Sequence, residues 1–321
     1  MSNNLEDILL VGTGAMSIEY VKVLKNIDVN YKVVGNTKES VEKFNASTGD
    51  DAYLGGIDKY ISENEMSIPD KAIVAVNGPN LFAVTKSLIL CGVKNILVEK
   101  PGCMSFSEID ELIEVAKEYE VKVYIAYNRR FYESVNETRR IIEDDGGLLA
   151  CNFEFTEWRH VIEKTQHPDY VKQKWFLMNS SHVVDLVFHI AGIPESYNPI
   201  IKGALDWHKA GCNYAGSGIT KKGVLFNYQA NWNAPGRWGI EFLTSKHRLF
   251  LRPLEQLAIQ NNGEINISPV EAQSNIDKLY KAGLYNEVCT FIEGDIFNRL
   301  CSLEEQKEHM KIYETISGEV Y

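Results

Sequence analysis

A short apolar run followed by two glycines near the start of the chain constrains its fold more than any other segment. Residues 8–19 read Ile-Leu-Leu-Val-Gly-Thr-Gly-Ala-Met-Ser-Ile-Glu, which predicts a buried strand, a tight turn and the beginning of a helix. Gly12 permits the turn, and Gly14 lets the backbone approach a pyrophosphate at the helix N-terminus. Ser17, at the third position of the G-x-G-x-x-G pattern, is small enough for close helix–strand packing. The segment predicts half of a dinucleotide-binding βαβ unit, and the alternative is a glycine turn in another α/β protein.

Length, charge and cysteine spacing narrow the class of protein further. A chain of 321 residues is long enough for two domains. The net charge of −11, with scattered Lys and Arg, argues against nucleic-acid binding. The polar start contains no export signal, and no apolar stretch is long enough to span a membrane. Six dispersed cysteines without a C-x-x-C pair predict reduced thiols. We therefore expect a cytoplasmic protein with no nucleic-acid or membrane partner.

Strand and helix patterns alternate through the first part of the chain, which predicts a doubly wound parallel sheet of the Rossmann type over residues 1–126. From about residue 147 the pattern changes to alternating runs separated by turns, which predicts antiparallel strands. The second domain, 127–321, is therefore expected to be α+β with a large, mostly antiparallel open sheet. The strands expected in the first domain are 8–11, 31–34, 72–76, 95–98 and 121–126. Those expected in the second include 149–157, 203–207, 212–219, 223–232, 238–244, 248–251 and 257–260, with helices at 181–191, 284–293 and 303–317.

The fourth predicted strand ends in Glu99-Lys100-Pro101. Ligands of an open parallel sheet bind beyond the carboxyl ends of its strands, so Lys100 is expected at the mouth of the cofactor cleft. A lysine there can donate a hydrogen bond to a substrate hydroxyl or carbonyl and favour its anionic form. Pro101 restricts the backbone of Lys100 to an extended conformation. The alternative is a surface lysine at a strand end.

A second candidate site lies on the predicted helix 181–191. His182 and Asp185 are three residues apart and share one helix face, and His189 lies two turns on from His182. A histidine near a helix start among apolar residues is a candidate general acid/base. Asp185 would orient it or complement the positive helix N-terminus. The alternative is a packed histidine with a satisfied hydrogen bond.

Four motifs together resemble the Gfo/Idh/MocA oxidoreductase family, because their order and spacing match along the whole chain. They are the turn from Gly12 to Ser17, Glu99-Lys100-Pro101, Tyr127-Asn128-Arg129-Arg130-Phe131, and His182-x-x-Asp185 ahead of Gly192. The resemblance implies a nicotinamide cofactor and a sugar, cyclitol or sugar-derivative substrate. It also implies an open sheet that forms a homodimer or homotetramer interface.

The resemblance assigns roles to particular residues. The family's catalytic lysine falls on Lys100 and its active-site histidine on His182. Many family dehydrogenases carry an aspartate four residues before this histidine, where this chain has Met178, and the neighbouring Asn179 cannot act as a base. Proton transfer therefore falls to His182, alone or with Lys100, and Tyr127 and Tyr170 are further candidates. The expected cofactor-binding residues are Gly12, Thr13, Gly14, Ala15, Met16, Asn36, Thr37, Lys38, Asn77, Glu99 and Lys100. The expected substrate-binding residues are Tyr127, Arg129, Trp175, Asn179, His182 and Asp185.

The end of the second predicted strand bears on the choice of cofactor. NAD-binding units usually have an Asp or Glu there, which holds the ribose 2′-hydroxyl. This chain has Asn36, Thr37 and Lys38 instead, which offer hydrogen-bond donors and a positive charge. The pattern favours NADP(H), and NAD(H) stays open because Lys38 can also point to solvent.

The segment 158–175 is rich in aromatic and basic residues and is a candidate wall or lid of a substrate pocket for a sugar with a phosphate, carboxylate or nucleotide. Ordinary surface composition is the alternative. His160 and His167 do not form a metal-ligand pattern, so no metal is expected. Trp232 and Trp238 fall on predicted strands, either at a subunit interface or in the core.

These observations predict an NADP(H)-dependent oxidoreductase that moves a hydride between nicotinamide and a secondary alcohol or ketone of a sugar derivative. Two alternatives remain. One is a lyase or glycosidase that uses tightly bound NAD(H) transiently, and the other is a non-catalytic dinucleotide-binding protein.

Overall fold

The structure is a computed structural model that describes residues 8–64 and 67–321, so the polar start of the chain lies outside the described residues. The chain divides into two compact units. The first unit contains Met1–Tyr127 and Leu284–Lys307, and the second contains Asn128–Gly283 and Glu308–Tyr321. The chain thus leaves the first unit one residue later than the expected boundary between 126 and 127, and then returns to it.

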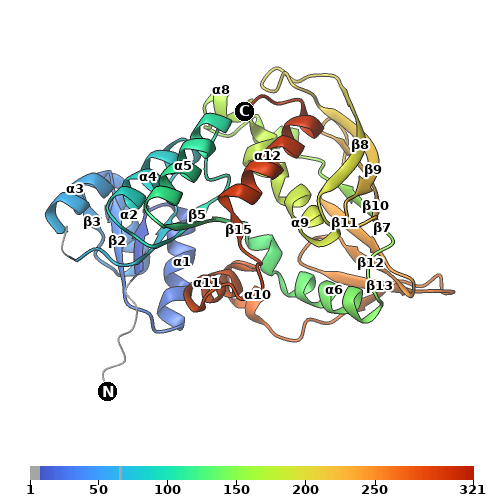
Figure 1. Cartoon of the computed structure of the whole chain (residues 1–321), viewed down its shortest axis with the longest axis horizontal. Helices are drawn as coiled ribbons and strands as arrows, with labels where there is room; N and C mark the ends of the chain where they lie inside the picture. The colour runs from blue at the N-terminus through green and yellow to red at the C-terminus, as the bar shows by residue number, and fades with distance from the viewer. Residues whose placement is uncertain (1–7, 65–66) are drawn as a thin grey trace. The chain divides into compact units, whose positions relative to one another are not determined.

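The first unit is built on a sheet with strand order β15-β6-β5-β4-β1-β2-β3, coloured blue to teal except for β15 in Figure 1. All its pairs are parallel except β15 with β6. The strand order reverses between β1 and β4, which is the switch point where open α/β sheets bind ligands. The predicted doubly wound sheet is confirmed. The strands are β1 (Ile8–Val11), β2 (Tyr31–Gly35), β3 (Tyr53–Leu54), β4 (Lys71–Val74), β5 (Asn95–Glu99), β6 (Lys122–Ala126) and β15 (Cys301–Ser302).

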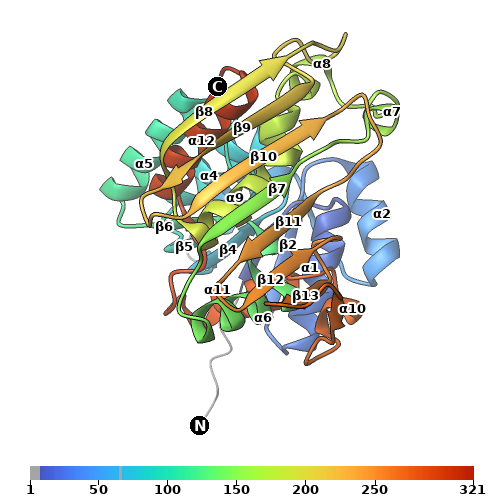
Figure 2. The same cartoon turned by 90° about the vertical axis from the view of Figure 1, so that its right-hand side faces the viewer.

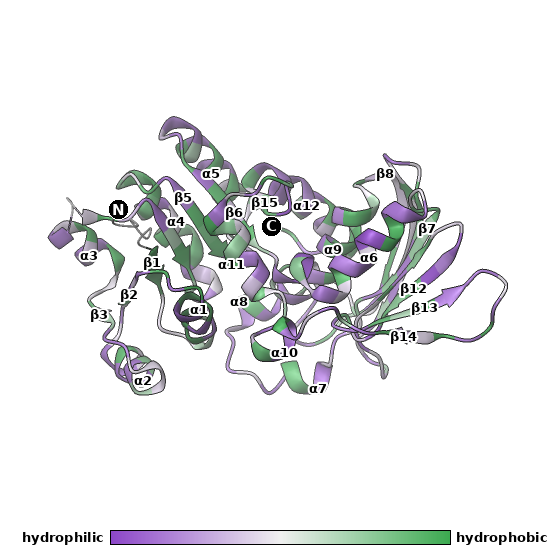
Figure 3. Ribbon diagram, turned by 90° about the horizontal axis from the view of Figure 1, so that it is seen from below, coloured by the Kyte–Doolittle hydropathy of each residue, from purple (hydrophilic) through white to green (hydrophobic). Residues whose placement is uncertain are grey.

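Helices connect these strands, and the central strands that they cover are hydrophobic (Figure 3). Capping sets where they begin: Ser105 accepts a hydrogen bond from the N–H of Glu108, and Thr37 accepts one from the N–H of Ser40. No helix among residues 8–64 and 67–321 combines the length and apolar character needed to cross a membrane. The helices are α1 (Ala15–Asn26), α2 (Lys38–Thr48), α3 (Gly56–Asn64), η2 (Gly78–Asn80), α4 (Leu81–Leu90), α5 (Phe106–Glu118) and α11 (Leu284–Glu293).

Residues 284–307 belong to the first unit, although they fall within the expected second domain, 127–321. Helix α11 packs against α1, and β15 pairs antiparallel with the edge of β6. Lys71 also donates a hydrogen bond of 2.9 Å from Nζ to the carbonyl of Ile292. The sequence between these segments gives no local signal of such a return, because the contacts join residues far apart in the chain.

The second unit is built on a sheet with strand order β14-β13-β12-β11-β7-β10-β9-β8 (Figure 2). Only β7 and β10 pair in parallel, so the predicted mostly antiparallel sheet is confirmed. The strands are β7 (Ala150–Glu154), β8 (Pro194–Lys202), β9 (Asn213–Thr220), β10 (Leu225–Asn231), β11 (Gly239–Leu243), β12 (His247–Leu251), β13 (Leu257–Asn261) and β14 (Ser268–Val270).

One predicted strand of this sheet is wrong. Residues 203–207 are not a strand: Leu205 and His208 close a turn through an isolated bridge, and the strand at this edge of the sheet is β8. No residue of β8 is buried, and it contains Pro199, which an edge strand tolerates because one row of its N–H groups needs no partner. Its sequence therefore lacks the apolar alternation that identifies a half-buried strand.

Helices cover one face of this sheet and leave the other open, as Figure 2 shows. On the covered face, Phe153 packs against Phe226, Tyr228 and Phe188 with ring centres 5.3–6.5 Å apart. Strand β10 alternates strictly, and its outward-facing Leu225 is 58% exposed. The helices are η3 (Asn128–Phe131), α6 (Glu133–Asp144), α7 (Arg159–Ile162), α8 (Asp169–Lys172), η4 (Phe176–Ser180), α9 (Ser181–Ala191), α10 (Ile276–Leu279) and α12 (Leu303–Ser317), which crosses the boundary between the units.

Candidate functional site

The glycine turn between β1 and α1 is shaped for a ligand. Gly12 has a φ of 127°, and a Cβ there would lie 2.3 Å from the carbonyl oxygen of Ala75, so only glycine fits. Gly14 has an ordinary φ of −85°, and a Cβ there would meet nothing within 4 Å. The protein's own packing therefore does not require Gly14, whereas a phosphate approaching the N-terminus of α1 does. Ser17 is fully buried against the carbonyl of Ala75, as expected for close helix–strand packing.

Hydroxyl groups join this turn to the end of β2. Thr13 and Thr37 both donate to Oγ of Ser40, at 3.0 and 2.8 Å. Asn36, Thr37 and Lys38 are all exposed, and Nζ of Lys38 lies 3.7 Å from a carboxylate oxygen of Glu42. Such an exposed pair is weak, so Lys38 is able to exchange it for another anion. Ser40 was not predicted, although a serine in the first turn of the following helix was a signal for it.

The turn that carries Lys100 is held by side chains on both sides. Glu99 accepts a hydrogen bond of 2.9 Å from the buried Tyr20 of α1, and burial together with Glu99 raises the pKa of Tyr20. The carbonyl of Pro101 accepts one of 3.0 Å from Gln306, whose Oε1 accepts one of 3.0 Å from Tyr127. Tyr127 is only 1% exposed, so the structure places it as a support of this turn. Asn77, also expected near the cofactor, is exposed just before η2.

In the second unit, the segment before His182 is a π-helix, η4, that continues into α9. π-Helical turns are rare and frequent at functional sites. The side chain of Glu319 accepts hydrogen bonds from the N–H groups of Phe176 and Leu177, at 2.7 and 3.2 Å. The same carboxylate pairs with Nε2 of the buried His208 at 2.7 Å. The end of the chain thus fixes the start of the helix pair that carries His182.

Replacing Glu319 with Ala should lower the free energy of unfolding by about 2–4 kcal/mol, because two N–H groups and His208 lose a buried acceptor. Denaturant unfolding followed by tryptophan fluorescence measures the change. Glu308→Ala, whose carboxylate is half-exposed in a 3.8 Å pair with Lys221, is the matched control and should cost less than about 1 kcal/mol. Equal losses in both variants would contradict the structural role of Glu319.

His182 and Arg129, which the sequence assigns to the substrate site, lie in contact. His182 is 4% exposed, and Nη1 of Arg129 lies 2.9 Å from its Nε2. Because a guanidinium only donates, Nε2 must accept, and the neutral imidazole carries its proton on Nδ1. The ring of Trp238 lies beside the imidazole of His182, with ring centres 6.1 Å apart.

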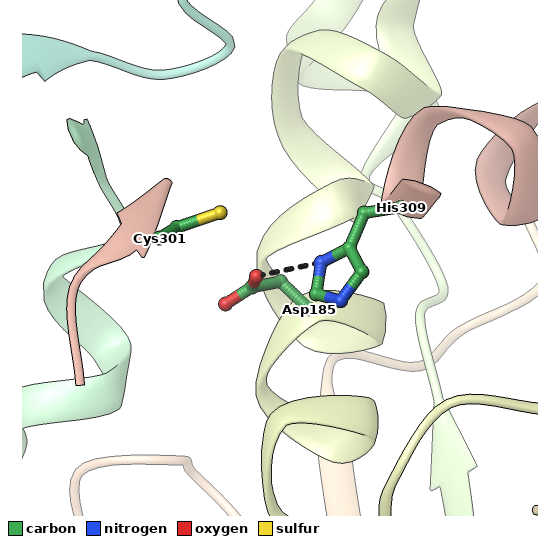
Figure 4. Close-up of side chains that lie close together, drawn as sticks. All are labelled: Asp185, Cys301 and His309. Carbon is green, nitrogen blue, oxygen red and sulfur yellow. Dashed lines mark hydrogen bonds and ion pairs between the residues drawn. The ribbon is translucent and has the colours of Figure 1, made fainter. Parts of the chain in front are cut away.

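Asp185, also assigned to the substrate site, is placed in a buried ion pair. Arg130 donates to both of its oxygens, at 2.8 and 2.5 Å, and Nδ1 of His309 lies 3.1 Å away (Figure 4). Burial raises the pKa of Asp185, but the charge and hydrogen bonds of Arg130 and His309 outweigh burial and hold that pKa well below its usual range. Because the guanidinium of Arg130 already contacts both oxygens of this carboxylate, a metal ion at Asp185 is disfavoured. Asp185 therefore holds η3, α9 and α12 together.

Asn179 reveals a residue that the sequence analysis missed. Its Nδ2 donates to both carboxylate oxygens of Glu157, at 2.9 and 3.0 Å, and the hydroxyl of Ser180 donates at 2.8 Å. Nη1 of Arg237 also donates a hydrogen bond of 3.1 Å to Oε2 of Glu157. Glu157 is 2% exposed, and burial raises its pKa despite these partners. Glu157 follows β7, and its partners Asn179 and Arg237 lie 22 and 80 residues further along the chain.

The remaining residues of the expected lid contact one another and their neighbours in and around α7 and α8. Trp175 packs against the rings of His167 and Trp207, with centres 5.7 and 6.4 Å apart. Arg159 pairs with Glu163 at 2.6 Å. Trp158 is 48% exposed, so part of this segment presents an aromatic surface to solvent.

The sheet order, the glycine turn and the lysine beyond β5 define a dinucleotide-binding Rossmann protein. Residues 7–127 match a family model described as the oxidoreductase family with an NAD-binding Rossmann fold, so this part of the chain is similar to Gfo/Idh/MocA proteins. The family resemblance predicted from the sequence motifs is confirmed for this domain.

Curated proteins are similar to part of the chain, and solved structures share its fold. An oxidoreductase of Formosa agariphila is 26% identical over 151 residues, which covers 44% of this chain and 46% of that protein. The 2,7-anhydro-N-acetylneuraminate hydratase of Escherichia coli is 25% identical over 111 residues, covering 33% and 30%. The matches thus span less than half of these curated relatives. The UDP-N-acetylglucosamine 3-dehydrogenase of Acidithiobacillus ferrooxidans shares the fold, with a TM-score of 0.76, 15% identity and coverage of 98% and 97%.

Proposed function

We propose that this chain is an NADP(H)-dependent oxidoreductase that moves a hydride between the nicotinamide and a secondary alcohol or ketone of a sugar derivative. The observation that carries the proposal is the ligand-shaped turn at Gly12 and Gly14, with Lys100 beyond the carboxyl end of β5 in the same sheet. The structurally similar Acidithiobacillus protein is a dehydrogenase of a nucleotide-linked sugar, which supports the substrate class.

The bound nicotinamide would supply the hydride acceptor or donor, and the chain's own residues the proton chemistry. We propose that Lys100 donates a hydrogen bond to the reacting oxygen and stabilises its negative charge. His182, neutral and buried, would exchange the proton. Met178 cannot take part, because a thioether does not titrate.

The choice of cofactor is tested by titrating the purified protein with NADPH and NADH, following the quenching of tryptophan fluorescence. We expect tighter binding of NADPH, because the exposed residues after β2 are donors and a cation. Lys38→Glu should weaken NADPH binding about tenfold and leave NADH binding within twofold. Lys43→Glu, exposed on the same helix, is the matched control. Tighter binding of NADH by the unaltered protein would contradict the proposal, and binding of neither would remove the oxidoreductase function.

The hydratase relative favours a second candidate, a lyase that uses tightly bound NAD(H) without net turnover. This candidate predicts a cofactor that co-purifies with the protein and resists dialysis. After the dialysed protein is denatured and removed, the absorbance of the supernatant measures the released cofactor. A cofactor that exchanges freely supports the dehydrogenase instead.

We also propose that the open face of the second unit's sheet pairs subunits into a homodimer or homotetramer, as the family resemblance implies. Exposed Leu149, Ile200 and Leu225 on or beside this sheet support it.

A further inference from the structure

Two arginines share one tryptophan beside His182. The guanidinium carbon of Arg237 lies 4.4 Å from the ring centre of Trp238, and that of Arg129 lies 5.1 Å from the same ring. Arg237 also lies 4.8 Å from the ring centre of Trp158. Stacking on aromatic rings restricts the planes of both guanidinium groups, so this arginine–tryptophan cluster is preorganised.

The charges of the two arginines are not balanced equally. Arg237 pairs with the buried carboxylate of Glu157, which Asn179 and Ser180 hold in place. Arg129 contacts only neutral acceptors, Oδ1 of Asn128 and Nε2 of His182, both at 2.9 Å.

No carboxylate within residues 8–64 and 67–321 forms an ion pair with Arg129. Asp185 is already paired with another arginine, because Arg130 donates hydrogen bonds to both of its oxygens. The cluster therefore carries a net positive charge that a ligand anion would neutralise.

Two buried donors of the cluster lack an acceptor. Nε of Arg129 and Nε1 of Trp238 are inaccessible to solvent and have no acceptor in the described part of the chain. Buried N–H groups without an acceptor are uncommon, and each asks for an explanation. A group with several anionic oxygens accepts from more than one donor at once and also neutralises Arg129.

We propose that Arg129, Arg237 and Trp238 form a binding site for an anionic group of the substrate, a carboxylate or a phosphate on the sugar. The inference rests on the proposed function and narrows its substrate class to acidic sugar derivatives. The side chain of Arg237 is 42% exposed, so the site opens to solvent at that end. Glu157 is a positioning residue, because it holds Arg237 from the buried side.

The test measures binding of D-glucuronate, D-glucose 6-phosphate and D-glucose by calorimetry at low salt, with NADPH present. We expect one or both acidic sugars to bind at least about tenfold more tightly than glucose, since hydrogen bonds to charged groups are the stronger ones. The ratio between glucuronate and glucose 6-phosphate identifies the preferred anion. Equal affinity for acidic and neutral sugars, or no measurable binding of either acidic sugar, overturns the proposal.

Variants assign the effect to the cluster. Arg129→Met and Arg237→Met should each lower the affinity for the acidic sugar, relative to the affinity for glucose, by about tenfold or more. Arg129→Lys and Arg237→Lys keep the charge, should retain part of the preference, and serve where a Met variant unfolds. Arg140→Met, on the exposed face of α6, is the matched control and should leave the preference intact. An unchanged preference in the Arg129 and Arg237 variants overturns the proposal.

Failure of this inference is distinguishable from failure of the proposed function. NADPH binding, measured by calorimetry in the same samples, reports on the cofactor site proposed in the first unit. Intact NADPH binding without a preference for acidic sugars refutes the anion site and leaves the oxidoreductase proposal standing. A preference for acidic sugars without NADPH binding supports the anion site and refutes the oxidoreductase.

Discussion

Replacing Lys100 with Met should lower turnover of a keto-sugar substrate by about 10²–10⁴-fold, because the reacting oxygen loses the donor that stabilises its developing charge. Methionine keeps a similar length and removes only the ammonium group. Steady-state NADPH consumption gives kcat, and fluorescence titration gives cofactor affinity in the same sample. We expect kcat to fall while the affinity for NADPH stays within about threefold.

Lys94→Met is the matched control for this variant. Lys94 is exposed just before β5, so its replacement leaves the sheet and the proposed active site unchanged. Turnover by Lys100→Met within a few-fold of the unaltered protein would refute the assigned role. A parallel loss of NADPH binding would mean instead that Lys100 serves the cofactor.

Replacing Asp185 with Asn should lower the free energy of unfolding by about 3–5 kcal/mol, because it leaves the fully buried guanidinium of Arg130 without its counter-charge. Denaturant unfolding measures the loss. Adding Arg130→Met to Asp185→Asn should recover part of it, since the uncompensated charge is then gone. Asp144→Asn, in an exposed pair with Arg140, should cost less than about 1 kcal/mol. A loss of that small size in Asp185→Asn would contradict the role of the ion pair.

The same ion pair gives the stability a dependence on pH. The pKa of Asp185 is lower in the folded chain than in the unfolded chain, where it is about 3.9. Its contribution is therefore fully present above about pH 4 and decreases as the pH falls further toward the folded pKa. Unfolding midpoints measured from pH 7 to pH 2 should fall more steeply below pH 4 for the unaltered protein than for Asp185→Asn.

Local periodicity predicted the elements well where a helix or strand has one buried face. The helices expected at 181–191, 284–293 and 303–317 have the bounds of α9, α11 and α12. The edge strand β8 was missed, because an edge strand with no buried residue gives no alternating pattern. The return of residues 284–307 to the first unit depends on pairing with β6, which no local pattern encodes.

The residues of the candidate site likewise fall into those that a local motif predicts and those that depend on distant contacts. Motif residues such as Gly12, Gly14 and Lys100 could be named because their chemistry depends on spacing along one strand and turn. Four supporting residues could not be predicted, because each forms hydrogen bonds with partners 22–205 residues away in the chain. They are Glu157, Gln306, His309 and Glu319. Asp185 shows the converse, since a carboxylate one turn from His182 binds an arginine 55 residues before it.

The two-part composition of the first unit restricts how this gene can recombine. A single crossover after residue 127 would join a foreign cofactor domain to this chain's own α11 and β15, which are shaped to α1 and β6 of the original. A fragment that ends there would expose the hydrogen-bonding edge of β6, a surface that promotes aggregation. Transplanting the cofactor domain between relatives therefore needs two segments exchanged at once, and we expect residues 1–127 and 284–307 to have been inherited as one evolutionary unit.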